Sequence, residues 1–297
     1  MGLVKKLPRR QQRLTRPIAH YTIGAWAILL LTICIPLFYG IYISLLNINL
    51  ADFLPPHFVG IKNYVTALTA PETWATLKIT IALMMMGMAI QIPLGMILAL
   101  ALFQQLRGTK IFRSILITPM LLTPVAVGLT FRFMFDTELG VINWFLSQFG
   151  IEGVNWLGAQ FSGLVAIVVV DSWQSIPFVM LLVLAALSAI PVSLFEAARV
   201  DGASSRQVFR AITLPLMLPT LLVIVMIKIM DFLKLFDTIF MLTRGGPGNA
   251  TTTLGLWTYK TGFQFLELSR AAALGVIIMI ITAPVYVLWR RSTRGIR

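Results

Sequence analysis

The chain has 297 residues, of which 58% are hydrophobic and only 12% are charged. Soluble globular proteins average about 25% charged residues, so this composition excludes an ordinary soluble domain and indicates a membrane protein. The formal net charge of +13 does not indicate a nucleic-acid partner, because the basic residues are not interleaved with aromatic residues on one face.

Six apolar stretches are long enough, to different degrees, to cross a bilayer as helices, since a spanning helix needs about 20 mostly apolar residues. They cover residues 23–45, 79–103, 115–135, 162–190, 214 onward (polar from Lys228) and 271–289. Prolines inside them predict kinks packed against neighbouring helices: Pro36, Pro93, Pro119, Pro124, Pro177 and Pro284. The sequence therefore predicts an all-α integral membrane protein with six transmembrane helices.

Lys and Arg gather in four places: the N-terminal tail, the second and fourth connections, and the C-terminal tail. By the positive-inside rule, both termini and the fourth connection are expected on the cytoplasmic side of the cytoplasmic (inner) membrane. The predicted domains are a basic tail (1–22), a six-span membrane domain (23–290) and a second basic tail (291–297). The first apolar run is too long for a signal peptide and no cleavage site follows it, which predicts an uncleaved span.

A polar insert (residues 191–215) interrupts the chain between the fourth and fifth spans and includes EAARVDGASSRQVFRAITLP. Ser193 and Glu196 fit a capping box, which predicts a short helix over about 194–200. Gly202 follows, where a helix can end in a left-handed conformation. Ser204 and Gln207 fit a second box, which predicts a second short helix that stops before residues 214–215.

Two roles for the polar insert remain open on these patterns alone. It could rest on lipid headgroups as an amphipathic helix, although it carries little bulky apolar surface. Alternatively, its small residues could let it dock in a groove of another protein.

The polar insert resembles the EAA loop found in membrane subunits of binding-protein-dependent ABC importers. The matching positions are Glu196, Ala197, Ala198, Asp201, Gly202, Ala203, Phe209, Ile212, Leu214, Pro215 and Pro219. Other pieces resemble the carbohydrate branch of this family, which includes the maltose transporter: FVGIKNY at 58–64, GVIN at 140–143, NWL at 155–157, FD at 236–237 and LTRGGP at 242–247. The resemblance implies a type I ABC importer permease fold.

In such an importer the polar insert would be the coupling helix, which sits in a cleft of a separate ATPase. The residues implied in this coupling are Glu196, Ala197, Ala198, Asp201, Gly202, Ala203 and Phe209. The family also implies a second permease subunit, two ATP-binding subunits that carry ATP and Mg, and an extracytoplasmic solute-binding protein. The chain itself would be a sugar permease without cofactor or enzymatic activity, in contact with membrane lipid.

Charged groups inside spans are costly in lipid and usually functional. Asp171, Gln174 and Phe178 share one helix face, as do Lys228 and Asp231. These faces could hydrogen-bond the hydroxyls of a sugar or polyol, and Trp173 or Phe178 could stack on a sugar ring. Alternatively, Asp171 and Lys228 could form an ion pair that only holds the bundle together.

The resemblance places six residues where maltose-type permeases line their substrate pocket: Asp171, Gln174, Ser175, Phe178, Lys228 and Asp231. The residue types at these positions differ from those in the maltose-type pocket. The positive charges of Lys228 and Lys234 leave open the possibility of an anionic substrate, such as a uronate or glycerol phosphate. Gln91, Arg132 and Lys234 are weaker candidates.

The sequence shows no metal-ligand cluster and no catalytic constellation. A rival class is a secondary transporter driven by an ion gradient, which would have inverted repeats and broken midplane helices. The sequence gives no sign of either.

Overall fold

The computed structural model describes residues 9–52, 55–104, 108–151 and 153–294. Its elements in chain order are α1 (Arg9–Ser44), β1 (Leu46–Asn47), β2 (His57–Phe58), α2 (Lys62–Thr69), α3 (Pro71–Phe103), α4 (Thr109–Ile117), the 3₁₀ turn η1 (Thr118–Leu121), α5 (Pro124–Met134), α6 (Val141–Ser147), α7 (Gln160–Ser188), α8 (Val192–Val200), α9 (Ser205–Val208), the π turn η2 (Phe209–Thr213), α10 (Leu214–Leu233), α11 (Asp237–Leu242), α12 (Leu254–Tyr259), the π turn η3 (Lys260–Gln264) and α13 (Leu268–Arg294).

The all-α prediction is confirmed, since the strands are only a two-residue antiparallel ladder between β1 and β2. Within the described residues, four helical stretches are long and apolar enough to cross a membrane: Ile23–Ser44, Pro71–Phe103, Gln160–Ser188 and Ser205–Leu233. A bent pair of helices could be a fifth, and α13 adds the shorter apolar stretch Leu268–Pro284. The count of six spans stays a prediction.

The third predicted span, residues 115–135, is wrong as a single kinked helix. The chain bends by 94° between the stretch Thr109–Leu121 and α5. Pro124 begins α5, and the residue before it, Thr123, is extended with ψ 137°, because a proline disfavours helical geometry in the residue that precedes it. Pro119 lies in the 3₁₀ turn, so the two prolines flank a break. The expectation of no broken helix is therefore also wrong.

The polar insert is helical on both sides of Gly202, whose φ is +73° as predicted. The first predicted capping box is wrong: α8 already begins at Val192, with Pro191 as its N-cap and no side-chain cap. Ser193 therefore lies inside the first turn and cannot cap it. The second predicted capping box, between Ser204 and Gln207, is confirmed. Gln207 Oε1 accepts hydrogen bonds from the backbone N–H and the hydroxyl of Ser204, both at 2.8 Å.

The second helix of the polar insert does not stop before Leu214. It continues through the π turn η2 into α10, as one stretch from Ser205 to Leu233. The wide π turn ends at Thr213, two residues before Pro215, where a regular α-helix would bring the proline ring against the carbonyl four residues earlier. The insert is thus mechanically continuous with α10.

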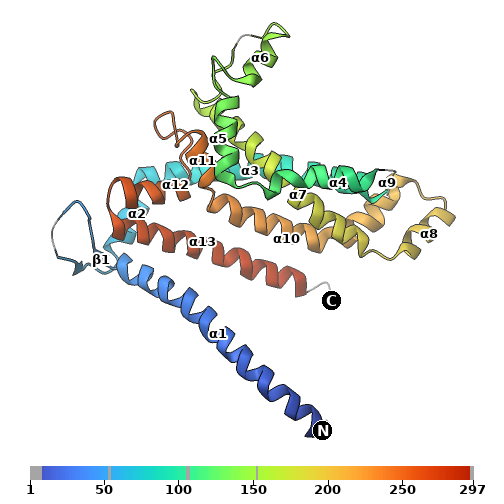
Figure 1. The fold of residues 1–297 in the computed structure, drawn as a ribbon, viewed down its shortest axis with the longest axis horizontal. Coiled ribbons are helices and arrows are strands. Elements are labelled where there is room, and N and C mark those ends of the chain that lie inside the picture. Colours follow the sequence, from blue (N-terminus) through green and yellow to red (C-terminus); the bar gives the residue numbers. More distant parts are fainter. Residues whose placement is uncertain (1–8, 53–54, 105–107, 152, 295–297) are drawn as a thin grey trace.

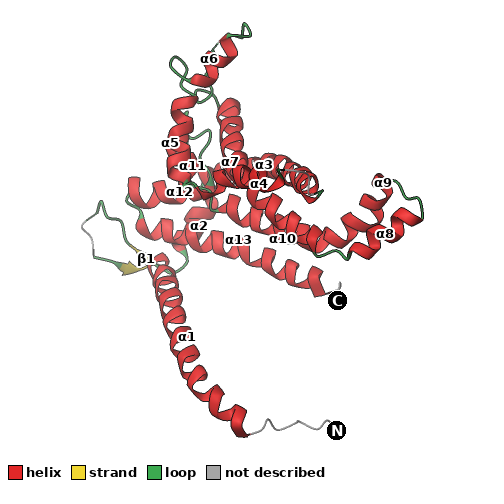
Figure 2. Ribbon diagram, turned by 45° about the vertical axis from the view of Figure 1, so that its right-hand side comes forward, coloured by secondary structure: helices red, strands yellow, loops and turns green. Residues whose placement is uncertain are grey.

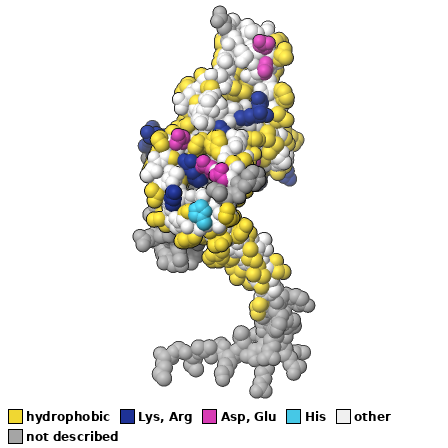
Figure 3. All heavy atoms as spheres, turned by 90° about the vertical axis from the view of Figure 1, so that its left-hand side faces the viewer, with side chains coloured by type: hydrophobic (Ala, Val, Ile, Leu, Met, Phe, Trp, Pro, Cys, Tyr) yellow, Lys and Arg dark blue, Asp and Glu magenta, His cyan; other side chains and the backbone are white. Residues whose placement is uncertain are grey.

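The helices α3, α7, α10 and α13 run side by side, while α1 leans away from them (Figures 1 and 2). The described start of α1 and the end of α13 lie at the same end of this bundle as α8 and α9, and β1 and α2 lie at the other end (Figure 1). Seen from the β1–α2 end, that end carries charged groups of both signs, whereas the described side chains of α1 are almost all hydrophobic (Figure 3).

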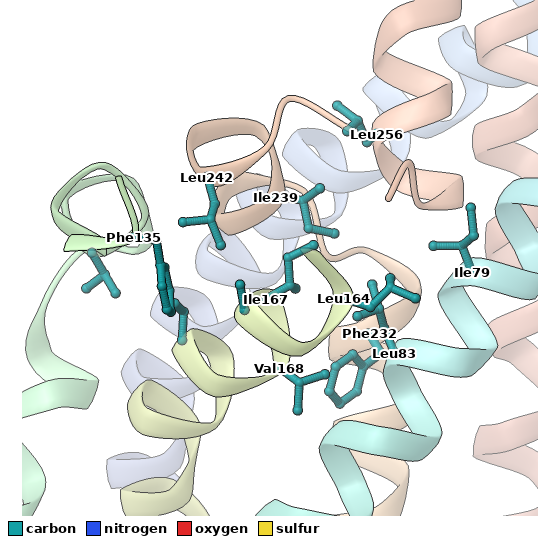
Figure 4. Close-up of a cluster of buried hydrophobic side chains, with 13 residues drawn as sticks. Ile79, Leu83, Phe135, Leu164, Ile167, Val168, Phe232, Ile239, Leu242 and Leu256 are labelled. Atoms are coloured by element: carbon teal, nitrogen blue, oxygen red, sulfur yellow. The ribbon is translucent and has the colours of Figure 1, made fainter. Parts of the chain in front are cut away.

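The most extensive helix pair is α3 with α7. One buried cluster gathers Leu83 of α3, Ile167 of α7 and Phe232 of α10 (Figure 4). A second cluster, which includes Val179, Met180 and Met217, packs the same helices further along. Because lipid is as apolar as these side chains, close packing rather than escape from water holds such helices together.

Candidate functional site

A cavity of about 460 Å³ lies where α7, α10 and two breaks in the helical chain meet. It is lined by Met120, Leu122, Pro124, Asp171, Gln174, Ser175, Phe178, Lys228, Asp231, Lys234, Leu235, Phe236, Asp237 and Thr238. All six residues that the sequence singles out as substrate contacts are among them. The structure therefore brings together side chains that are more than fifty positions apart in the chain.

Helix α7 supplies four of these residues from one face. Asp171, Gln174, Ser175 and Phe178 follow at spacings of three, four and seven residues, which are the spacings of neighbours on a helix surface. Of the two aromatic candidates for stacking, only Phe178 lines the cavity. Trp173 lies elsewhere on α7, is 41% exposed and packs against Phe131, with ring centroids 5.4 Å apart.

Both breaks in the helical chain lend backbone to the cavity wall, and in each a side chain satisfies a carbonyl left without a helical partner. Gln174 Nε2 donates to the carbonyl of Leu122 at 2.7 Å. Thr253 Oγ1 donates to the carbonyl of Leu235, between α10 and α11, at 2.8 Å. Irregular backbone at membrane depth occurs where it is buried in protein or lines a cavity, and both breaks line this cavity.

Charged side chains of both signs line the cavity. The Asp231 carboxylate forms an ion pair with Lys234 at 3.2 Å and a longer one with Lys228 at 4.0 Å. The Lys228 ammonium also lies 5.2 Å from the centroid of the Phe232 ring. Lys228 is only 2% exposed, so its charge depends on these few partners.

The carboxylate of Asp171 is held from outside the cavity. Gln91 of α3 donates from Nε2 to Asp171 Oδ2 at 2.7 Å. Within the described chain, no ion pair joins Asp171 to Lys228 at 4.0 Å or less; the pairs found involve Asp231 and Glu267. The direct ion pair that the sequence left open as an alternative is therefore not formed.

Among the weaker candidates, Lys234 lines the cavity and Gln91 contacts Asp171 from α3, while Asp237, which the sequence does not single out as a site residue, lines the cavity as well. Lys234 and Asp237 line the cavity because the chain leaves helical geometry between α10 and α11. Arg132 lies on α5, is exposed and does not line the cavity. The part of the chain that the structure describes holds no group of three or more His, Cys, Asp or Glu residues that could bind a metal ion.

The residues that the resemblance implies in coupling lie around and shortly after the turn between α8 and α9, at the far end of the bundle from β1 (Figure 1). Glu196, Ala197, Asp201 and Gly202 are exposed. Ala198 is buried, and its carbonyl accepts a hydrogen bond from the N–H of Ala203 at 2.9 Å, which closes the turn. Phe195 lies against Phe103 at the end of α3, with ring centroids 6.2 Å apart. The turn is thus anchored to the bundle on one side and open on the other.

Comparison with known proteins places this arrangement among transport subunits. Residues 91–297 match the family described as binding-protein-dependent transport system inner membrane component. The chain is 35% identical to the probable ABC transporter permease protein y4oQ of Sinorhizobium fredii, over 97% of this chain and 94% of that protein. It is 40% identical to the trehalose/maltose transport system permease protein MalF of Thermococcus litoralis, over 70% of this chain and 71% of that protein.

A solved structure has the same fold along almost the whole chain. It is a bacterial alginate ABC transporter in complex with an alginate pentasaccharide-bound periplasmic protein, and the matched chain has a TM-score of 0.80 at 23% identity, over 97% of this chain and 98% of that chain.

Proposed function

This chain belongs to the family of binding-protein-dependent transport system inner membrane components, and we propose that it moves a sugar through the cavity between α7 and α10. It is the permease subunit of an ABC importer, and its family does not carry the ATPase. The sugar is the proposed part. It is supported by the trehalose/maltose relative and by the chemistry of the cavity.

One observation carries the proposal: the six residues expected to contact substrate line a single cavity. Its size falls within the roughly 300–1,000 Å³ range of small-molecule sites. Carboxylates accept hydrogen bonds and ammonium groups donate them, so the lining can satisfy both roles of a sugar hydroxyl. Three carboxylates and two ammonium groups line it, which favours a neutral sugar or polyol over an anionic one.

The polar insert is the proposed point of coupling to ATP hydrolysis. The exposed turn around Gly202 would dock into one of two ATP-binding subunits, where ATP and Mg bind. Because α9 continues into α10, a push on this turn would reach Lys228 and Asp231 through continuous helix. This direct connection supports the coupling role of Glu196, Ala197, Ala198, Asp201, Gly202, Ala203 and Phe209 over a role in resting on lipid.

The remaining partners are proposed from the family. A second permease subunit would complete the open side of the cavity, and a solute-binding protein would deliver the sugar from outside, as the periplasmic protein of the alginate transporter suggests. The chain would cross the inner membrane several times with both termini in the cytoplasm, which agrees with the common end of α8, α1 and α13 (Figure 1).

Initial uptake of labelled maltose, trehalose and galacturonate in native cells tests this function. Depleting ATP with arsenate should abolish uptake. Collapsing the proton and sodium gradients with ionophores should leave the initial rate of uptake unchanged. In addition, Asp171→Asn and Lys228→Met should each raise the apparent KM roughly ten- to hundredfold, because a hydrogen bond to a charged group contributes about 1.5–3 kcal/mol. Uptake that follows the ion gradient would instead favour a secondary transporter, and unchanged KM values would exclude the cavity as the sugar site.

A further inference from the structure

Gln91 contacts Asp171, a residue of the cavity wall, from the side that faces away from the cavity. No residue of α3 lines the cavity itself. The side chain of Gln91 is 0% exposed. Nε2 donates to Asp171 Oδ2 at 2.7 Å and to Ser172 Oγ at 3.3 Å, while Oε1 is buried without a hydrogen-bond partner. Because a carboxylate can only accept, the amide must turn its NH₂ group toward Asp171. The orientation of Gln91 is thus set by Asp171, at the expense of an unsatisfied buried oxygen.

The packing of α3 leaves Gln91 little freedom. Gly87, Gln91 and Gly95 follow at intervals of four and share one buried face of α3. A Cβ at Gly95 would lie 2.6 Å from Val179 Cγ1 and 3.1 Å from the backbone nitrogen of Met180, so α3 and α7 touch there almost backbone to backbone. Gln91 is one turn away from this contact, which fixes how far its amide lies from Asp171.

The same helix face also positions the opposite charge. A Cβ at Gly87 would clash with the ring of Phe232, which fills the space that the glycine leaves. The Lys228 ammonium lies 5.2 Å from the centroid of that ring and 4.0 Å from Asp231 Oδ2. Helix α3 therefore fixes the position of Asp171 through the amide of Gln91, and that of Lys228 through the ring of Phe232.

Asp171 and Lys228 are 8% and 2% exposed and have opposite charges. In a setting of low dielectric constant, such groups attract each other strongly, and burying either one unpaired is costly. Yet they do not pair within 4.0 Å, and the partner that Asp171 has instead is Gln91.

We propose that Gln91 is a positioning residue that keeps Asp171 from pairing with Lys228, so that both charged groups stay available to sugar hydroxyls. This rests on the proposed function, in which the cavity binds the sugar. Without the amide, Asp171 turns to Lys228, and a sugar must then break an ion pair before it can bind. Gln91 thereby sets the affinity of a site that it does not touch.

The experiment is a double-mutant cycle between Gln91→Met and Lys228→Met, read out as the apparent KM and maximal rate of labelled-sugar uptake in native cells. Methionine is close to glutamine in volume but has no amide to donate. In the wild-type background, Gln91→Met should raise KM about tenfold, which corresponds to about 1.4 kcal/mol, with a maximal rate changed less than about twofold. In the Lys228→Met background, where the Lys228 ammonium is no longer there for Asp171 to turn to, the same change should raise KM less than about threefold.

Thr76→Val is the matched control, since it removes another buried polar group of α3, whose hydroxyl bonds only to the carbonyl of Thr73. It should leave KM unchanged. Equal effects of Gln91→Met in both backgrounds, or none in either, would overturn the positioning role. If Gln91→Met does not assemble, Gln91→Asn, whose amide is one methylene too short, replaces it in the cycle. The two ideas fail separately, because unchanged KM in Asp171→Asn and Lys228→Met would reject the sugar site itself.

Discussion

Gly202 allows a graded test of the coupling role of the polar insert, because its substitution cost comes from the backbone alone. Its φ is +73°, and a Cβ built at this position meets no atom within 4 Å. Any penalty therefore reflects the left-handed conformation, which disfavours an L-residue by roughly 1–2 kcal/mol. Asparagine tolerates this region best, alanine less well, and β-branched valine least.

A strain of roughly 1–2 kcal/mol shifts the population of the docking-competent turn about five- to thirtyfold. We therefore expect sugar-stimulated ATP hydrolysis to fall in the order wild type, Gly202→Asn, Gly202→Ala, Gly202→Val. The assay is ATP turnover by the purified complex with loaded binding protein, beside co-purification of the ATPase subunits. Equal turnover in all four proteins, with complete assembly, would refute the idea that this turn transmits ATP hydrolysis.

Three further predictions address packing, charge and topology. Gly95→Ala should lower the free energy of unfolding by about 1–3 kcal/mol through overpacking against Val179. Gly275→Ala should leave it unchanged, because a Cβ at that position meets nothing within 4 Å. The thermal melting temperatures of the two purified complexes test this difference. Burial lowers the pKa of Lys260 below its ordinary value of 10.5. The unfolded chain therefore holds the proton more tightly than the folded one, and stability should rise as pH approaches 10.5 from below. Lys260→Met should abolish that rise, and a melting temperature with the same pH slope in both proteins would contradict it. A reporter fused after Arg297 should read as cytoplasmic and one inserted near Gly248 as extracytoplasmic; finding both on one side would reject the six-span topology.

Local patterns in the sequence place the α7 residues of the cavity wall on one helix face. The spacing of Asp171, Gln174 and Phe178 puts them on one face of any helix, and this regularity survives whatever packs around it. The left-handed Gly202 and the Gln207 contact of Ser204 are likewise local features, set by residues within a few positions. The convergence of α7 with α10, by contrast, came from the resemblance and not from spacing.

The features that the sequence missed depend on contacts between distant parts of the chain. The sequence predicts kinks at Pro119 and Pro124, but a full break needs a partner for the freed carbonyl of Leu122, and Gln174 supplies it from another helix. The continuity of α9 with α10 depends on a π turn that no simple pattern marks. Gln91 is only a weaker candidate in the sequence, because the residue that it contacts, Asp171, lies eighty positions later.

Protection of a cysteine by sugar tests the central claim most directly. In a Cys34→Ser background, which removes the single native cysteine, Ser175→Cys places a thiol in the cavity wall. Ser114→Cys, on the exposed surface of α4, serves as the control. In membranes that hold the intact complex, transported sugar should slow maleimide labelling at position 175 and leave labelling at position 114 unchanged. Equal labelling rates at position 175 with and without sugar would contradict a sugar site between α7 and α10.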